Sequence, residues 1–222
     1  MRKDNILAED ILGEVYIMGY ESFSLVDNKY YGGNQGWLND FMYTSKFWAD
    51  RSCGVVAAAN LASYKSKELN LSSLYSYESR NKEDYTKHIY DLYKFINPAF
   101  YGVPTINNMV RGLVKFGESR AIRFEPIYFK RKWSLENIIN YIESGLRENN
   151  PVLVLTWNTP LRDLRNHWVT ITGLIRTRDG KCYMVTSNWG RMEIYSLDDW
   201  LNHSSLYKGL IYFRVSYATI KN

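Results

Sequence analysis

The distribution of apolar residues predicts four helices in the first two-thirds of the chain. Small and apolar side chains fill most positions of 53–66, so this helix is expected to be buried on nearly every side. In three later segments the apolar residues recur every three or four positions, which is the spacing of an amphipathic helix. These segments are 82–96, 106–116 and 135–147.

After residue 150 the pattern becomes that of β-strands. The first strand is predicted at 151–157, an apolar run rich in Val and Leu. Later strands are predicted at 167–174, 182–187, 193–195 and 210–217, with a short helix at 197–201. Because helices come first and strands second, without alternation, the fold class expected is α+β.

Length and composition favour one globular domain over 1–222. Of 222 residues, 45% are hydrophobic and 23% charged, which excludes wholesale disorder. The first 36 residues have no regular pattern, and residues 1–44 are treated as an N-terminal extension of uncertain role. Such an extension either covers a binding site or adds to the sheet. The oligomeric state is left open.

Charge and hydropathy narrow the partners and the location. The net charge is +5, but the one dense basic run is Lys130–Lys132, which is typical of a solvated turn. We therefore expect no nucleic-acid partner. Neither a signal peptide nor an apolar run long enough to span a membrane is present, so we expect a cytoplasmic protein without a membrane partner.

The scarcity of cysteine and histidine limits the candidates for nucleophilic chemistry. Of 2 cysteines, Cys53 is predicted at the N-terminus of a buried helix, where the helix dipole and free N–H groups lower a thiol pKa. Its own N–H is a candidate oxyanion donor. Gly54 is expected to leave room for a substrate. Cys182 lies within a predicted strand and is interpreted as structural.

A thiol nucleophile needs a base, and the chain has 3 histidines. His167 leads a predicted strand and is the preferred base. His88 is placed on the polar side of its helix, and His203 follows a short helix. Asn188, after the next strand, is the preferred residue to orient His167, with Ser187 as the open alternative.

Two segments resemble papain-like cysteine peptidases. Residues 50–54, Asp-Arg-Ser-Cys-Gly, resemble their nucleophile segment, and 166–173, Asn-His-Trp-Val-Thr-Ile-Thr-Gly, resembles their histidine strand. The order of elements from 134 to 190 is most similar to the bacteriocin-leader-peptidase-like branch. The resemblance implies a nucleophile-bearing buried helix packed against an antiparallel sheet, with the site in the cleft between them.

The same resemblance implies the activity. Cys53, His167 and Asn188 would form a catalytic triad that cleaves a peptide or isopeptide amide of a peptide or protein substrate through a thioester. No metal or organic cofactor is implied. Alternatives on the same fold are an acyltransferase or transglutaminase-like enzyme and a catalytically dead peptide-binding module.

Two positions depart from the pattern of these peptidases. Ser187 occupies the place three residues before the glycine where they have Asn, and the other departure concerns the oxyanion donor. They have a glutamine six residues before the cysteine as an oxyanion donor, whereas position 47 here is Phe (53 − 6 = 47). Gln35, Asn39 and the indole N–H of Trp48 are the substitutes considered, and the sequence does not select among them. Loss of one such donor costs about 10²–10³ in rate.

Overall fold

The computed structural model describes residue 6, residues 8–203 and residues 206–218. The α-helices are α1 Trp37–Asp40, α2 Lys46–Ala49, α3 Cys53–Glu68, α4 Lys82–Ile96, α5 Ile106–Glu118, α6 Leu135–Arg147 and α7 Leu197–His203. The strands are β1 Ile11–Tyr16, β2 Leu25–Val26, β3 Tyr30–Tyr31, β4 Ile122–Tyr128, β5 Val152–Trp157, β6 His167–Thr177, β7 Cys182–Asn188, β8 Arg191–Ser196 and β9 Tyr207–Tyr217. Short 3₁₀ helices are η2 Ala8–Asp10, η3 Tyr20–Ser22, η4 Ser72–Leu74 and η5 Arg162–Leu164.

The centre of the molecule is an antiparallel sheet in the order β4-β9-β5-β6-β7-β8. Strand β6 is long enough to pair with two neighbours on one side. Its first half pairs with β5, and its second half pairs with β1. The predicted α+β class with an antiparallel sheet is therefore confirmed.

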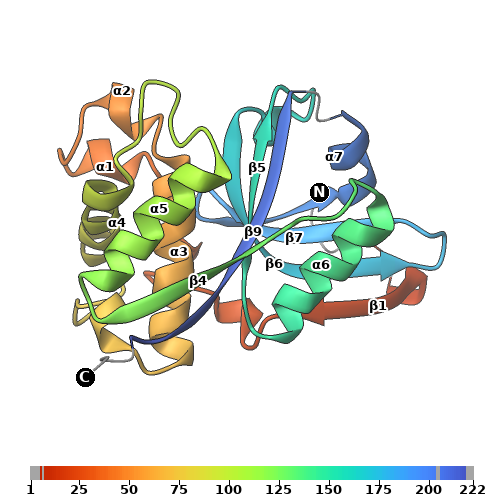
Figure 1. Cartoon of the computed structure of the whole chain (residues 1–222), viewed down its shortest axis with the longest axis horizontal. Coiled ribbons are helices and arrows are strands. Elements are labelled where there is room, and N and C mark those ends of the chain that lie inside the picture. The colour runs from red at the N-terminus through yellow and green to blue at the C-terminus, as the bar shows by residue number, and fades with distance from the viewer. Residues whose placement is uncertain (1–5, 7, 204–205, 219–222) are drawn as a thin grey trace.

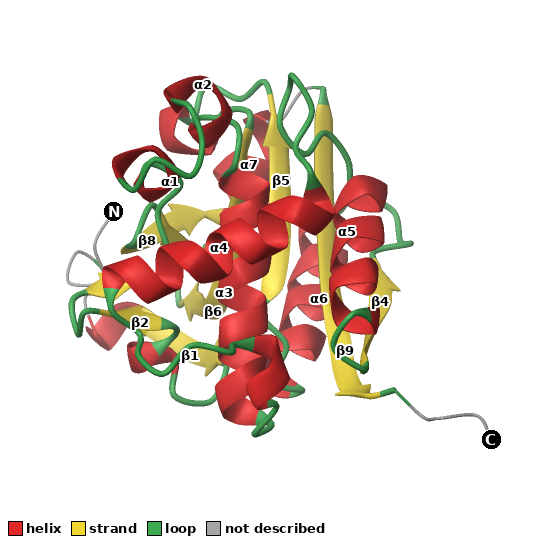
Figure 2. Ribbon diagram, turned by 90° about the vertical axis from the view of Figure 1, so that its left-hand side faces the viewer, coloured by secondary structure: helices red, strands yellow, loops and turns green. Residues whose placement is uncertain are grey.

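Helices cover both faces of the sheet because its strands alternate apolar residues toward two cores. On β5, Leu153 and Leu155 belong to a core shared with α3, α4 and α5, whereas Val152 and Val154 belong to one shared with α6 and α7. Figure 1 shows α3, α4 and α5 to the left of the sheet and α6 and α7 to its right. Figure 2, seen from the left of that view, shows α4 crossing in front of α3.

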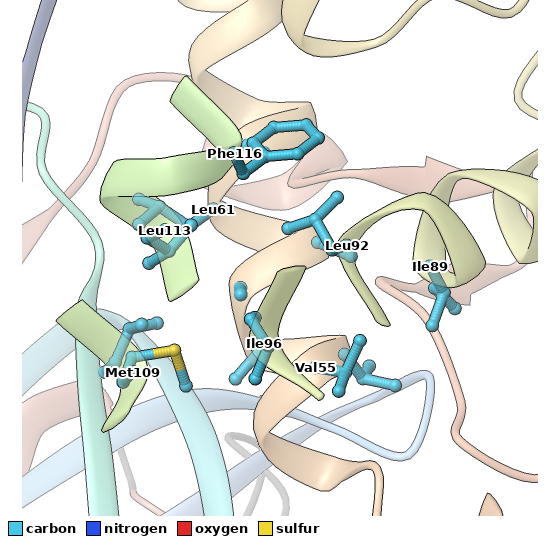
Figure 3. Packing of buried hydrophobic residues seen from close by; sticks show 14 of the residues in the cluster. Val55, Leu61, Ile89, Leu92, Ile96, Met109, Leu113 and Phe116 are labelled. Carbon is cyan, nitrogen blue, oxygen red and sulfur yellow. The ribbon is translucent and has the colours of Figure 1, made fainter. Parts of the chain in front are cut away.

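Helix α3 runs through the larger core, as its small and apolar sequence predicts. Apolar side chains from α4 and α5 pack around it, and Figure 3 shows Leu61 of α3 near Leu92, Leu113 and Phe116. Each of these four side chains is fully buried. Burial of a side chain of this size contributes about 1.5–3 kcal/mol, so α3 is held firmly enough to fix the residue that opens it.

The predicted irregularity of the first 36 residues is wrong. Strand β1 pairs with β6 from Tyr16↔Gly173 to Ile11↔Thr177, and β2 pairs with β3. Strand β4 was also missed, because its alternation is interrupted by Pro126 at the sheet edge. The N-terminal residues described here thus belong to the folded body and extend the sheet.

Within the described ranges, none of the helices combines the length and the apolar character that crossing a bilayer requires.

Candidate active site

Cys53 opens α3, where the first backbone N–H groups have no partner inside the helix. The N-cap residue Ser52 does not cap them, because its Oγ donates instead to the Trp48 carbonyl oxygen at 2.7 Å. The backbone N–H groups of Cys53, Gly54 and, from β6, Trp168 act on the Cys53 sulfur in the direction that lowers its pKa. The sequence-predicted nucleophile is therefore surrounded by hydrogen-bond donors.

Cys53 as a residue is only partly buried, yet desolvation dominates the electrostatics of its thiol. The three N–H groups favour the thiolate, but removal from water disfavours it more strongly and raises the pKa of Cys53 above its ordinary value. The predicted lowering of this pKa by the helix N-terminus is wrong in direction. The sulfur is a neutral thiol at neutral pH.

Gly54 serves packing rather than access. A Cβ at this position would lie 2.7 Å from Val103 Cγ2 and 3.1 Å from Trp168 Cδ1. The Trp168 indole N–H also donates to the Val103 carbonyl oxygen at 2.7 Å. The space beside Gly54 that was expected to admit a substrate is therefore filled by Val103. The hydrogen bond from Trp168 to Val103 joins the loop before α5 to the start of β6.

His167 and Asn188 meet at neighbouring strand ends. His167 begins β6 and Asn188 ends β7, and the two strands pair antiparallel. The imidazole Nε2 lies 2.8 Å from Asn188 Oδ1, and both side chains are buried. Ser187, the alternative left open, donates to the Tyr31 carbonyl oxygen at 2.7 Å instead.

The surroundings of Asn188 assign the imidazole tautomer. Asn188 Nδ2 donates to Tyr195 Oη at 3.0 Å and faces the Asp163 carbonyl oxygen at 3.5 Å. A carbonyl oxygen accepts only, so the amide nitrogen belongs on that side and Oδ1 faces His167. Nε2 of His167 therefore carries the proton, and Nδ1 is the basic ring nitrogen.

Trp189 covers the imidazole. Its ring centroid lies 4.7 Å from that of His167, with 37° between the planes. Trp189 and Gly190 form the two-residue turn between β7 and β8, with φ of 46° and 74°. The N-terminal loop holds this turn, because Tyr31 N–H donates to the Gly190 carbonyl oxygen and Asn34 Nδ2 to that of Trp189.

Burial also keeps the imidazole neutral. It lowers the pKa of His167 to about 4, although the hydrogen bond to Asn188 and the charge of Asp163 act in the opposite direction. Together with the raised pKa of Cys53, this makes the pair a neutral thiol and a neutral imidazole at pH 7. The base is therefore unprotonated and able to accept a proton.

Cys53, His167 and Asn188 line one narrow cavity of about 10 Å³. This volume is at the lower limit for one water molecule. Gln35 lines the same cavity, and neither Asn39 nor Trp48 does. Of the three oxyanion donors considered from sequence, the fold thus brings Gln35 to the cysteine.

The Gln35 amide is held in one orientation. Its Nε2 donates to the Asp50 carbonyl oxygen at 3.0 Å, and its Oε1 is buried without a partner among the described residues. A flipped amide would set two carbonyl oxygens against each other. One Nε2 hydrogen is engaged by Asp50, and the bond to Asp50 leaves the second Nε2 hydrogen unused.

The remaining cysteine and histidines lie away from this cavity. Cys182 is 1% exposed, and burial raises its pKa to about 12, as expected of a structural thiol. His88 was predicted on the polar side of its helix, but it is buried, with Nε2 3.1 Å from the Ala59 carbonyl oxygen. His203 is exposed at the end of α7.

Neither a search for metal-binding groups nor comparison with known proteins assigns a function to this site. Among the described residues there is no group of three or more His, Cys, Asp or Glu side chains arranged to hold a metal ion. No model of a known protein family matches the chain. No curated protein matches it either. The interpretation of the site therefore depends on its own geometry.

Proposed function

We propose that this protein is a thiol hydrolase of the papain-like type that cleaves a peptide or isopeptide amide. The observation that carries the proposal is the His167 Nε2–Asn188 Oδ1 hydrogen bond inside a cavity shared with Cys53 at a helix N-terminus. This bond leaves Nδ1 as the base. A nucleophile, a base and a residue that orients the base are the parts this chemistry needs.

The neutral ground state determines the order of events. As the Cys53 sulfur attacks the substrate carbonyl carbon, the thiol proton moves to His167 Nδ1, so no free thiolate has to exist beforehand. The imidazolium then gives that proton to the leaving amine, and the C–N bond breaks to leave a thioester. Water, deprotonated by His167, hydrolyses the thioester and regenerates the thiol.

We assign two donors to the oxyanion of the tetrahedral intermediate. One is the backbone N–H of Cys53 at the start of α3, which the helix dipole reinforces. The other is the second Nε2 hydrogen of Gln35, on a side chain that Asp50 holds in place. Gln35 takes the role that the glutamine missing at position 47 would have had.

The surface next to Cys53 supports a peptide substrate. Phe47 and Phe100 are exposed, with their ring centroids 5.5 Å apart. The Arg51 guanidinium lies 3.5 Å from the Phe47 centroid and donates to the backbone carbonyls of both residues. An aromatic surface fixed in this way is suited to binding an apolar side chain of a polypeptide.

A direct test is to look for the acyl-enzyme. The protein is incubated with p-nitrophenyl acetate, and we expect a burst of nitrophenolate with one acetyl group on the peptide that contains Cys53. Cys53→Ala should abolish the burst, while Cys182→Ser, the matched control, should retain it. An unmodified Cys53 in the wild-type protein would contradict the proposal and favour the peptide-binding module. An added amine that captures the acetyl group would indicate an acyltransferase.

A further inference from the structure

Helix α3 carries a buried polar residue, Asn60, on the face that bears Cys53. Asn60 follows Cys53 by seven residues (60 − 53 = 7), which is two helical turns, and it is 2% exposed. It also lines the cavity that contains Cys53 and His167. The reaction described above uses no group of this side chain, although burying an amide among apolar residues is costly unless it is fully hydrogen-bonded.

The Asn60 amide binds three different segments of the chain. Its Oδ1 accepts from the Gly33 backbone N–H at 2.8 Å and from Tyr85 Oη at 2.8 Å. Its Nδ2 donates to Ser187 Oγ at 3.1 Å. The two donors to Oδ1 define the amide orientation, so these assignments are consistent with one another.

Two of these segments carry the other groups of the site. Gly33 precedes Gln35 by two residues, and Ser187 immediately precedes Asn188. Ser187 Oγ donates in turn to the Tyr31 carbonyl oxygen at 2.7 Å, which closes the connection between the two segments. The third partner, Tyr85, lies on α4 and does not line the cavity.

The segment of Gly32 is packed closely against Ser187 and Asn60. A Cβ on Gly32, which has φ of +83°, would lie 2.4 Å from Ser187 Oγ and 2.7 Å from Asn60 Nδ2. The Gly32 backbone, the Ser187 hydroxyl and the Asn60 amide are therefore in direct contact. At this place the segment 32–36, called the Gln35 loop below, crosses the end of β7. Hydrogen bonds in such a dry environment are strong and direction-dependent.

We infer that Asn60 is a positioning residue, which sets the Gln35 loop and the Asn188 strand end in register with Cys53. The inference rests on the proposed function for its catalytic meaning. The hydrogen bonds themselves join the nucleophile helix to both of the segments that complete the site. Loss of the Ser187 bond is expected to loosen Asn188 and, through it, the orientation of His167.

The test compares two variants that each remove one hydrogen bond to Asn60. Ser187→Ala removes the 3.1 Å bond that leads to Asn188, together with the bond from Ser187 to Tyr31. Tyr85→Phe removes a 2.8 Å bond that leads only to α4. A direct Asn60→Ala exchange removes all three bonds and risks misfolding, so it is the secondary variant. Thermal unfolding of both single variants checks that they are destabilised to a similar degree.

The first measurement is independent of any activity. The His167 Nε2 proton, bound to Asn188 Oδ1 and buried, should give a slowly exchanging NMR signal in the wild type. Ser187→Ala should broaden or abolish this signal, and Tyr85→Phe should retain it. The second measurement is the burst with p-nitrophenyl acetate. We expect Ser187→Ala to lower its maximal rate at least about tenfold with little change in the half-saturating ester concentration.

The outcomes separate the two proposals. An unchanged His167 signal in Ser187→Ala, or equal loss of it in Tyr85→Phe, would overturn the positioning role whatever the activity is. A signal lost only in Ser187→Ala, in a protein whose wild type forms no acyl-enzyme, would uphold the positioning role and refute the proposed function.

Discussion

At the scale of single residues, desolvation decides the state of the reactive pair. Three backbone N–H groups act to lower the pKa of Cys53, yet burial raises it, and burial lowers the pKa of His167 to about 4. Both shifts favour the uncharged form. In the proposed reaction the proton therefore moves from the Cys53 thiol to His167 during attack on the substrate, and no thiolate–imidazolium pair exists beforehand.

This neutral pair predicts a particular pH dependence for alkylation of Cys53 by iodoacetamide. The reagent reacts with the thiolate, so the rate should rise about tenfold per pH unit between pH 6 and pH 8.5 or so, without a plateau at acidic pH. Mass spectrometry of the modified peptide measures the rate at each pH. A rate that is already maximal near pH 5 would show a preformed ion pair and contradict the pKa directions given above.

The burst rate should depend on pH over a different, more acidic range than alkylation does. His167 acts as a base only when neutral, and this form is present above its folded-state pKa of about 4. The burst rate with p-nitrophenyl acetate should therefore persist from pH 7 down to about pH 5 and fall below that, provided the protein is folded. A midpoint near 6.5, the ordinary value for histidine, would show that the imidazole is hydrated in solution.

At the scale of elements, the site depends on where the N-terminal loop crosses β7. Gly32 has φ of +83° and is crowded, whereas Gly180 has φ of +84° and nothing within 4 Å of a Cβ. Gly180→Ala should cost about 1–2 kcal/mol of the free energy of unfolding, from backbone strain alone. Gly32→Ala should cost about 1–3 kcal/mol more, because it also overpacks the contact with Ser187.

Urea unfolding of the two variants measures this difference. Equal destabilisation would mean that the loop moves aside without cost and does not fix the position of Gln35. The comparison separates steric crowding from left-handed backbone strain, because the two glycines share nearly the same φ.

The sequence predicted the helices and the candidate site residues better than it predicted the strand pairing and the burial around them. The bounds of α4 and α6 follow from local periodicity, and α3 begins where its small and apolar residues predicted but ends two residues later, at Glu68. Cys53, His167 and Asn188 were selected by their places at element ends. Strands β1 and β4 were missed because edge pairing depends on distant partners. For the same reason the pKa direction of Cys53 was wrong, since its burial comes from segments far away in the chain.

The proposed oxyanion donor, Gln35, shows the same limit of sequence-based prediction. Two short helices, α1 and α2, separate Gln35 from Cys53, so only the folded chain brings the Gln35 amide to the cavity. Asn60 was not singled out at all, because one polar residue in a small, apolar helix has no motif. Gln35 and Asn60 can be identified only from the residues that they contact in the folded chain, and not from their neighbours in sequence.

At the scale of the whole molecule, buried histidines make stability depend on acid. Burial lowers the pKa of His88 and of His167 from 6.5 to about 4. Between these values the unfolded chain binds protons that the folded chain does not, so stability is complete above about pH 6.5 and declines as the pH falls to 4. Each histidine contributes on the order of 3 kcal/mol to this decline.

Urea unfolding between pH 4 and pH 7.5 checks this prediction. His88→Gln should remove about half of the decline while leaving the proposed site untouched, and His203→Gln, at an exposed position, should remove none of it. A wild-type stability that does not change over this range would show that neither histidine is buried in its neutral form.

The most direct test of the account is the burst rate of Cys53 acylation by p-nitrophenyl acetate in two histidine variants. His167→Gln removes the base at similar volume, and His203→Gln is the matched control. General-base catalysis is worth about 10²–10⁴ in rate, so the account predicts a fall of at least about 100-fold in His167→Gln and less than about twofold in His203→Gln. Acylation of Cys53 at the wild-type rate in His167→Gln would contradict it.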